Sequence, residues 1–134
     1  MASIMDVEGI GETYAEKLKA IGIATTEALL KQGATPQGRK DIAEKSGISP
    51  TLILEWVNLS DLFRIKGVGE EYSDLLEEAG VDTVVELSKR NAENLFKKLM
   101  EVNAEKKFVR RLPTQKQVED WIAQAKELPR IVTY

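Results

Sequence analysis

Hydrophobic residues along the chain recur at three- and four-residue spacing, which is the period of an amphipathic helix. Residues 12–21 place Tyr14, Leu18 and Ile21 on one helix face, and Gly22 follows at the position where a left-handed residue commonly ends a helix. The β-branched residues occur singly or in pairs, without the alternation that is typical of strands. The pattern predicts an all-α protein of about nine short helices.

Residues that cap helix N-termini precede several further hydrophobic segments: Ser49, Thr83, Asn91 and Thr114. Ser49 stands before Pro50, and proline is favoured at the first position of a helix. The helix over residues 50–63 has little polar surface, so we expect it to be central. Thr114 and Gln117, like Thr83 and Glu86, have the spacing of a capping box.

The segment at residues 7–14 recurs at residues 65–72, 58 positions later. Both copies read apolar-X-Gly-apolar-Gly and reach a tyrosine three residues later, and three further pairs keep the register: Leu18 and Leu76, Gly22 and Gly80, Thr25 and Thr83. Trp56 and Trp121 have similar neighbours but stand 65 positions apart, so the second copy carries a seven-residue insertion. We predict a duplication in one compact domain over residues 1–134, with a first unit at 1–62 and a second unit at 63–134 that share a core.

The duplication leaves one helix without an obvious place. The helix over residues 50–63 leads into the second glycine segment, whereas almost nothing precedes the first. The helix over residues 115–128 is the leftover equivalent, and we expect it to dock beside residues 5–12, in the same chain or in a partner chain. The aromatic residues of the repeat are expected to be packing residues: Tyr14, Trp56, Tyr72 and Trp121.

Composition restricts the chemistry that the chain can carry out. The sequence has no Cys and no His, which removes disulfides, thiol and imidazole catalysis and the usual zinc ligands. No other nucleophile–base pattern is evident, so we expect no enzymatic activity, no resident cofactor and no metal site. No apolar run is long enough to span a bilayer, and the N-terminus lacks the pattern of a signal peptide. These features predict a cytoplasmic protein without a membrane partner.

Charge is distributed unevenly around a net charge of −3. Residues 67–88 contain seven acids and no base, whereas residues 97–116 contain seven bases and two acids. Four of these bases form a basic patch: Lys106, Lys107, Arg110 and Arg111. Three interpretations of this basic patch are open. It is a solvated helix face, or it pairs with the acidic segment within the chain or across a dimer, or it contacts nucleic acid.

The two Gly-apolar-Gly segments have the residues of a tight turn that leads into a helix. Glycine adopts positive φ without a steric penalty, and the amides at the start of the following helix lack intrahelical partners and attract anions. At Gly9-Ile10-Gly11 and Gly67-Val68-Gly69 the chain resembles the helix-hairpin-helix superfamily. Two copies resemble its tandem form, which implies a pseudo-twofold helical domain that grips the DNA backbone without reading bases. The whole chain is also similar to an uncharacterised family of small bacterial proteins known only as a domain of unknown function.

The resemblance implies a non-catalytic binding module of helix-hairpin-helix type that contacts the DNA backbone. The candidate contacts are the hairpin residues and nearby bases: Gly9, Ile10, Gly11, Lys17, Lys19, Arg64, Lys66, Gly67, Val68 and Gly69. A protein-interaction or self-assembly module that uses complementary acidic and basic helix faces is the alternative. The resemblance also allows a monovalent cation at a hairpin.

The residues around the glycines depart from the DNA-binding members of the superfamily. Those members often have proline before the first glycine and Lys or Arg after the second, whereas here Glu12 and Glu70 follow the second glycine. At about 5 Å and an effective dielectric near 20, one like charge costs on the order of 3 kcal/mol before salt screening. Because its segment holds no base, we expect the second hairpin to be the poorer phosphate site.

Overall fold

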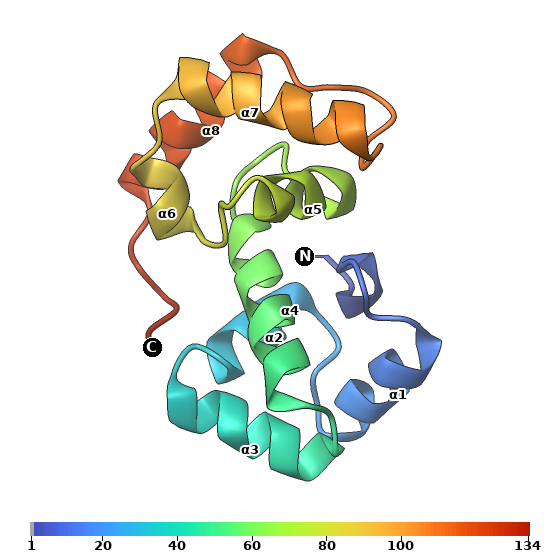
Figure 1. Ribbon diagram of the computed structural model, residues 1–134. Coiled ribbons are helices and arrows are strands. Elements are labelled where there is room, and N and C mark those ends of the chain that lie inside the picture. The colour runs from blue at the N-terminus through green and yellow to red at the C-terminus, as the bar shows by residue number, and fades with distance from the viewer. Residues whose placement is uncertain (1) are drawn as a thin grey trace.

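A computed structural model describes residues 2–134, which form one short 3-10 helix and eight α-helices (Figure 1). In chain order these are η1 (Ile4–Asp6), α1 (Glu12–Ala20), α2 (Thr26–Gln32), α3 (Pro36–Ser46), α4 (Pro50–Leu62), α5 (Glu70–Glu78), α6 (Val84–Ser88), α7 (Ala92–Glu105) and α8 (Gln115–Glu127). The all-α prediction is therefore confirmed. None of the helices within residues 2–134 combines the length and apolar character that a bilayer crossing requires.

The helix N-termini form where the capping residues predict them. The side chains of four residues accept a hydrogen bond from a backbone amide at the start of α4, α6, α7 and α8: Ser49, Thr83, Asn91 and Thr114. The capping box of Thr114 and Gln117 is complete. The box at α6 is only half formed, because the Glu86 carboxylate bonds to Arg90 instead of returning to the cap.

The two predicted copies have the same local structure. Gly9 and Gly67 have φ of 94° and 95°, and Gly22 and Gly80 have φ of 87° and 93°. The backbone hydrogen bonds repeat as well. Ile10 donates to Val7 as Val68 donates to Ile65, each at 3.1 Å. Ile23 donates to Leu18 as Val81 donates to Leu76, each at 2.9 Å. The repeat in sequence is therefore a repeat in backbone conformation.

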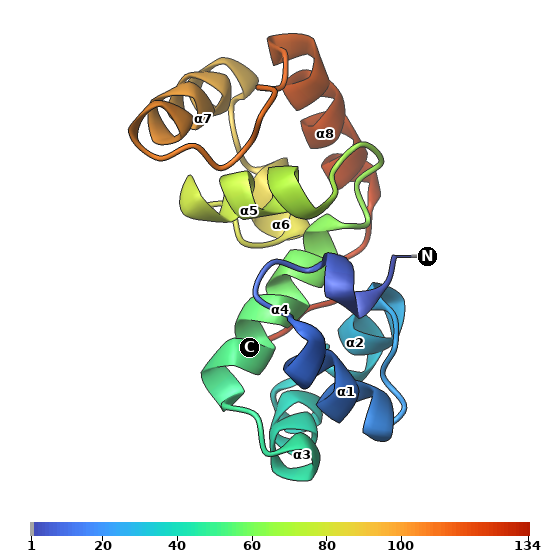
Figure 2. The same cartoon turned by 90° about the vertical axis from the view of Figure 1, so that its right-hand side faces the viewer.

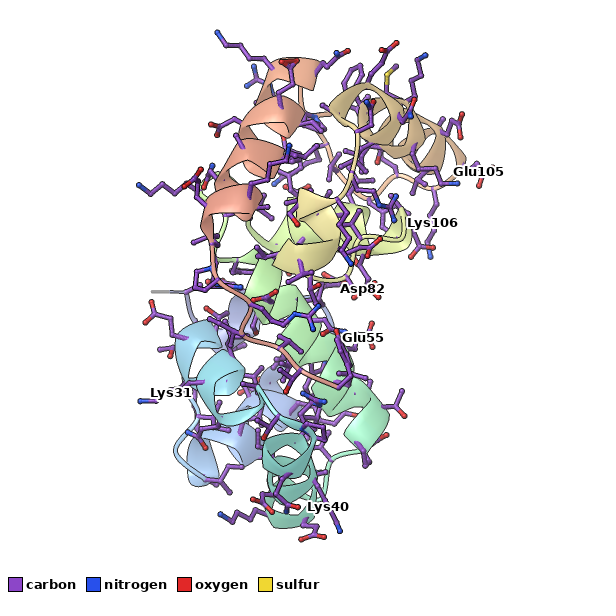
Figure 3. All side chains as sticks on the ribbon, turned by 90° about the vertical axis from the view of Figure 1, so that its left-hand side faces the viewer. Lys31, Lys40, Glu55, Asp82, Glu105 and Lys106 are labelled. Atoms are coloured by element: carbon purple, nitrogen blue, oxygen red, sulfur yellow. The ribbon has the colours of Figure 1, made fainter. Side chains whose placement is uncertain are left out.

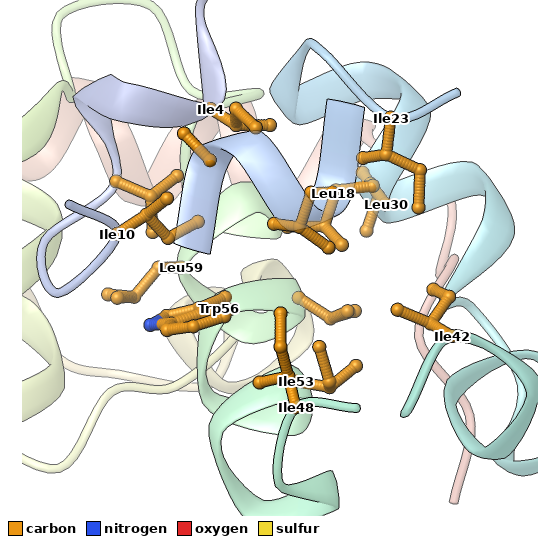
Figure 4. Close-up of a cluster of buried hydrophobic side chains, with 14 of the residues drawn as sticks. Ile4, Ile10, Leu18, Ile23, Leu30, Ile42, Ile48, Ile53, Trp56 and Leu59 are labelled. Carbon is orange, nitrogen blue, oxygen red and sulfur yellow. The ribbon is translucent and has the colours of Figure 1, made fainter. Parts of the chain in front are cut away.

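The buried hydrophobic residues form two clusters, which differs from the single shared core expected from the sequence. Trp56 lies in the first cluster, with Ile10 and Ile53 among its neighbours (Figure 4). Trp121 lies in the second cluster. Helix α4 crosses between the units and contributes Leu59 to the first cluster and Leu62 to the second. Each set of helices thus packs around its own tryptophan, and α4 joins the two sets.

Helix α8 packs against α6 and α7 in the second unit. The prediction that it docks beside residues 5–12 of the same chain is wrong, because Trp121 of α8 lies against Gly67 of the second hairpin instead. An ideal Cβ at Gly67 would lie 3.3 Å from Trp121 Nε1, and one at Gly9 would lie 3.1 Å from Trp56 Nε1. Each hairpin is covered by the tryptophan helix that follows it in the chain, so the first hairpin has no place for α8.

The last residues of the chain return from α8 to the first unit, where the C-terminus lies beside α4 (Figure 2). Val132 is buried in the first hydrophobic cluster. The Thr133 amide donates to the Ala34 carbonyl at 2.8 Å, and Arg39 Nη2 donates to the Thr133 carbonyl at 2.7 Å. This tail, residues 129–134, therefore links the second unit to the first by non-covalent contacts, in addition to the covalent connection through α4.

A buried carboxylate stabilises the junction between α4 and α6. Asp61 is 1% exposed and accepts hydrogen bonds from Arg64 Nε at 2.8 Å and from the Val84 amide at 2.9 Å. At the corresponding place in the first unit, the Thr26 amide donates to the Ala2 carbonyl at 3.0 Å. A side chain in one copy therefore replaces a backbone carbonyl in the other.

Candidate binding site at the two glycine hairpins

Each hairpin contains two glycines that have different structural roles. Gly9 and Gly67 adopt positive φ and lie against a tryptophan indole, so a side chain there meets both a conformational and a steric penalty. Gly11 and Gly69 have φ of −85° and −119°, which any residue adopts. A Cβ at either of these two positions would meet no atom within 4 Å. The fold itself therefore does not require the second glycine of either copy.

Gly11 and Gly69 are the N-caps of α1 and α5, and neither helix has a side-chain cap. The first amides of both helices consequently have no capping oxygen from a side chain. Serine, threonine or aspartate at these positions would supply that oxygen. Both copies instead leave the helix N-terminus sterically open.

The tyrosines after the hairpins are packing residues, as the sequence predicts. The Tyr14 and Trp56 rings lie 5.0 Å apart, and the Tyr72 and Trp121 rings lie 5.1 Å apart. The Tyr72 hydroxyl also donates to the Arg111 carbonyl at 2.9 Å. This bond attaches the inserted segment of the second unit to its hairpin.

The predicted bases of the first hairpin lie away from its amides. Lys17 and Lys19 are exposed in the last turn of α1, at the opposite end of the helix from Gly11. The Lys17 ammonium lies 6.0 Å from the centre of the Tyr14 ring. The charged side chain nearest in sequence to these amides is Glu12, in the first turn of α1. Its carboxylate stabilises the helix but repels a phosphate.

Arg64 and Lys66, the predicted bases before the second hairpin, have different environments. Arg64 is held by Asp61 and by the Pro129 carbonyl, to which its Nη1 donates at 2.9 Å, so its guanidinium stabilises the fold. Lys66 is exposed, and its backbone is clamped by Gln124. The Lys66 amide donates to Gln124 Oε1 at 2.8 Å, and Gln124 Nε2 donates back to the Lys66 carbonyl at 3.1 Å.

The inserted segment supplies the base that the second hairpin lacks in sequence. Arg110 and Arg111 line, with residues 69–72, a cavity of about 450 Å³ at the start of α5. The Arg110 amide donates to Glu71 Oε1 at 3.3 Å, and the Arg110 guanidinium lies 3.7 Å from Glu71 Oε2. This pairing offsets the charge of Glu71, one of the seven acids of residues 67–88, and the expectation that the second hairpin is the poorer phosphate site stays a prediction.

Asn103 shapes this inserted segment. Its Oδ1 accepts hydrogen bonds from the Phe108 amide at 2.8 Å and from the Val109 amide at 3.1 Å. The resulting turn directs Arg110 to α5, whereas Lys106 and Lys107 line a different cleft. The structure therefore divides the predicted basic patch between two places, and Asn103 carries no sequence signal for this role.

Carboxylates gather where the first unit meets α5, and we call this group the acidic seam: Glu8, Glu55, Glu70, Asp74 and Glu77. Burial, with the charges of its acidic neighbours, raises the pKa of Asp74 to about 6. Burial and the facing Glu55 raise the pKa of Glu77 to about 8. Burial and Glu8 likewise raise the pKa of Glu70. Part of the seam lines a cleft of about 440 Å³ that also contains Lys106 and Lys107.

No group of three or more acidic side chains within residues 2–134 has the arrangement of a metal site. The second hairpin brings together the first backbone amides of α5 and two arginines, Arg110 and Arg111. Such an arrangement can hold an anion or a peptide, and it contacts no base edge in nucleic acid.

Comparison with known proteins gives one match. The model of a family described as "Domain of unknown function (DUF4332)" matches residues 8–128. No curated protein and no solved structure gives a significant match. The family match begins before the first hairpin and ends after α8, so it includes both hairpins and both tryptophans. The chain belongs to the family of domains of unknown function designated DUF4332.

Proposed function

We propose that the chain is a non-catalytic binding module made of two helix-hairpin-helix units, and that its hairpins contact the phosphate backbone of DNA. The contact uses backbone amides, so it does not depend on base sequence. The second hairpin, with Arg110 and Arg111 beside it, is the stronger of the two contacts.

The observation that carries this proposal is the second glycine of each hairpin. Gly11 and Gly69 need no special φ and have open space where a side chain would stand. A capping side chain at either position would stabilise the following helix by about a few tenths of a kcal/mol relative to glycine. Retaining glycine in both copies keeps the amides of α1 and α5 accessible to an external oxygen anion.

The positions of the arginines support the second hairpin as the main contact. Arg110 and Arg111 lie beside the amides of α5 and are exposed. Arginine holds phosphate oxygens in a bidentate manner, which complements the helix N-terminus. Glu8 of the first hairpin lies near Glu70 of α5, so the two hairpins are close to each other, and we propose that one duplex contacts both.

A protein-interaction module is the second candidate, and the charge around the hairpins favours it. Asp6, Glu8 and Glu70 form a negative surface beside both amide sites. Such a surface repels DNA at low salt and attracts a basic protein segment.

A binding titration with capped hairpins separates the two candidates. Labelled duplex DNA is titrated with the protein at about 20 mM and 200 mM salt and followed by fluorescence anisotropy, with wild type compared to Gly11→Asp/Gly69→Asp. The new carboxylates cap α1 and α5, so the variant is expected to be at least as stable as wild type and to lose at least tenfold in affinity. Lys31→Ala/Lys40→Ala changes the net charge equally, lies outside the hairpins, and is expected to bind nearly as wild type does.

The second hairpin is tested separately with Arg110→Glu/Arg111→Glu, which is expected to abolish binding. Salt-dependent binding that is insensitive to both hairpin variants contradicts the proposed contact. Absence of binding at about 20 mM salt, together with a dimer in light scattering that dissociates at high salt, supports the protein-interaction candidate instead.

A further inference from the structure

The segment that follows α7, residues 106–113, is attached to the second hairpin by side chains of α5. The Tyr72 hydroxyl donates to the Arg111 carbonyl at 2.9 Å, and the Arg110 amide donates to Glu71 Oε1 at 3.3 Å. Asn103 fixes the turn that precedes these contacts through two further hydrogen bonds. The backbone of Arg110 and Arg111 is therefore held beside the start of α5.

Glu71 makes a second contact in addition to this anchor. Its Oε2 lies 3.7 Å from Arg110 Nη2, and Glu71 is the only ion-pair partner of Arg110 within residues 2–134. The Arg110 side chain is 89% exposed, and that of Glu71 is 46% exposed. Exposed ion pairs contribute little to stability, so this pair opens readily.

The two copies of the repeat differ at the position of Glu71. Glu12 and Glu70 correspond to each other, so both copies have an acid in the first turn of the helix, where it stabilises the helix N-terminus. Glu71 corresponds to Thr13, and the first copy lacks the inserted segment that carries Arg110. The additional carboxylate is thus present only in the copy that has an arginine for it to bind.

The guanidinium that holds Glu71 is a group that also holds phosphate. Carboxylates and phosphodiesters both accept hydrogen bonds through anionic oxygens, and arginine binds either of them. Arg110 lines the cavity of about 450 Å³ at the start of α5, together with Gly69 and Glu71. A phosphate in this cavity therefore competes with Glu71 for the same guanidinium, and the charge of Glu71 also repels the phosphate.

We propose that Glu71 is an internal competitor that lowers the affinity of the second hairpin for the DNA backbone. In the free protein the Glu71 carboxylate neutralises Arg110, and a bound phosphate takes its place. The bond from the Arg110 amide to Glu71 keeps the segment in position while the guanidinium changes partner. This inference rests on the proposed DNA contact and assigns a residue that sets its strength.

Glu71→Gln tests the competition, because glutamine keeps an oxygen that can accept from the Arg110 amide and loses the charge. Labelled duplex DNA is titrated at about 20 mM and 100 mM salt, and the variant is expected to bind about three- to fivefold more tightly than wild type. Glu105→Gln is the control, since it removes one exposed acid at the end of α7, which Figure 3 shows beside Lys106 at the edge of the second unit. At about 100 mM salt the control is expected to change the affinity less than about 1.5-fold.

A double-mutant cycle separates competition from general repulsion of DNA. If Glu71 acts through the guanidinium of Arg110, Glu71→Gln has no effect on the affinity when Arg110→Ala is also present. The gain is expected to persist beside Arg111→Ala, because Glu71 pairs with Arg110. An equal gain in all three backgrounds contradicts the competition and indicates long-range repulsion alone.

Carbon-13 NMR of the side-chain carboxyl groups follows the exchange in wild type. When saturating duplex DNA is added, the Glu71 carboxyl signal is expected to move toward its position in the free Arg110→Ala variant. The Glu105 signal is expected to stay where it is. A Glu71 signal that does not move when DNA is bound would overturn the inference.

The outcomes distinguish this inference from the proposed function. Equal affinities of wild type and Glu71→Gln, with binding that Arg110→Glu/Arg111→Glu abolishes, overturn the competition and leave the DNA contact standing. Absence of DNA binding by both proteins at about 20 mM salt overturns the competition and the proposed contact together. Binding by Glu71→Gln alone supports both.

Discussion

Single residues define the hairpins through backbone conformation. Gly9 and Gly67 combine a positive φ with close approach of an indole ring, whereas Gly11 and Gly69 have neither constraint. The first glycine of each hairpin is thus required by the fold, and the second is open to a partner. Glycine therefore has two different structural roles at positions only two residues apart in each hairpin.

This distinction predicts the stability of glycine variants. Gly9→Ala is expected to lower the free energy of unfolding by about 1–3 kcal/mol, because alanine is strained at positive φ and its Cβ meets Trp56. Gly11→Ser is expected to be neutral or stabilising, since serine caps α1. Urea unfolding of both variants measures the difference. Equal stability of the two variants would contradict the assigned roles.

The buried ion pair gives a second prediction for single residues. Asp61→Ala leaves Arg64 and the Val84 amide without their acceptor, so the free energy of unfolding is expected to fall by about 3–5 kcal/mol. The exposed pair of Glu93 and Lys97, at 3.3 Å, provides the comparison. Glu93→Ala is expected to cost less than about 0.5 kcal/mol, and denaturant unfolding of both variants checks the contrast.

At the level of elements, each tryptophan helix covers the hairpin that precedes it, and the tail connects the second unit back to the first. Helix ends follow local signals, because a cap acts on amides within the same turn. The position of α8 follows from packing, since Trp121 fits Gly67 in the same way as Trp56 fits Gly9. Sequence spacing alone does not distinguish these two hairpins as partners for α8.

The tail is expected to contribute to the stability of the first unit. Val132→Ala removes two buried methyl groups from the first hydrophobic cluster, so it is expected to lower the free energy of unfolding by about 2 kcal/mol. Thr133→Ala removes an exposed hydroxyl that donates to the Ala34 carbonyl at 3.3 Å but leaves the backbone bond to Ala34 intact, so it is expected to cost less than about 0.5 kcal/mol. Hydrogen exchange at Ala34 and Arg39 should become faster in Val132→Ala only. Unchanged exchange there would mean that the tail is not anchored as described.

For the whole molecule, folding partly buries Asp74 and Glu77 of the acidic seam and brings them close to other acids. Both effects favour the protonated form. The native state therefore binds more protons than the unfolded chain between the ordinary carboxyl pKa and the raised values of the seam.

Stability is consequently expected to depend on pH in a defined direction. The pKa values of Asp74, about 6, and Glu77, about 8, lie above those of the unfolded chain, so the stabilisation is present at low pH and is lost as pH rises through these values. Urea unfolding should show a free energy that falls steadily between pH 5.5 and 8.5. Glu55→Gln/Glu77→Gln should flatten this slope, whereas Glu44→Gln/Glu119→Gln, which removes two exposed acids elsewhere, should not. A free energy that rises with pH in this window would contradict the sign of both shifts.

Much of the local structure could be predicted from the sequence, because the responsible interactions span only a few residues. The caps at Ser49, Asn91 and Thr114 form as expected, and so does the left-handed stop at Gly22. The duplication was evident because glycine at positive φ leaves the same signature in each copy.

Part of the candidate site was also evident from sequence alone. The hairpin glycines were recognised by their repeated spacing, and they lie in matching conformations. The sequence predicts Lys17 and Arg64 as flanking bases, but the first lies at the far end of its helix and the second is held by Asp61. The sequence predicts a basic patch that includes Arg110 and Arg111, but it does not predict where the patch lies in the fold.

The sequence by itself determined the all-α class, the repeat and the two hairpins, since periodicity, capping and glycine conformation act over a turn or two of helix. Only the tertiary structure decided that α8 covers the second hairpin, that Asn103 turns Arg110 toward α5, and that carboxylates of both units meet at the acidic seam. These outcomes depend on packing and charge between segments that lie tens of residues apart in the sequence, so no local sequence pattern predicts them.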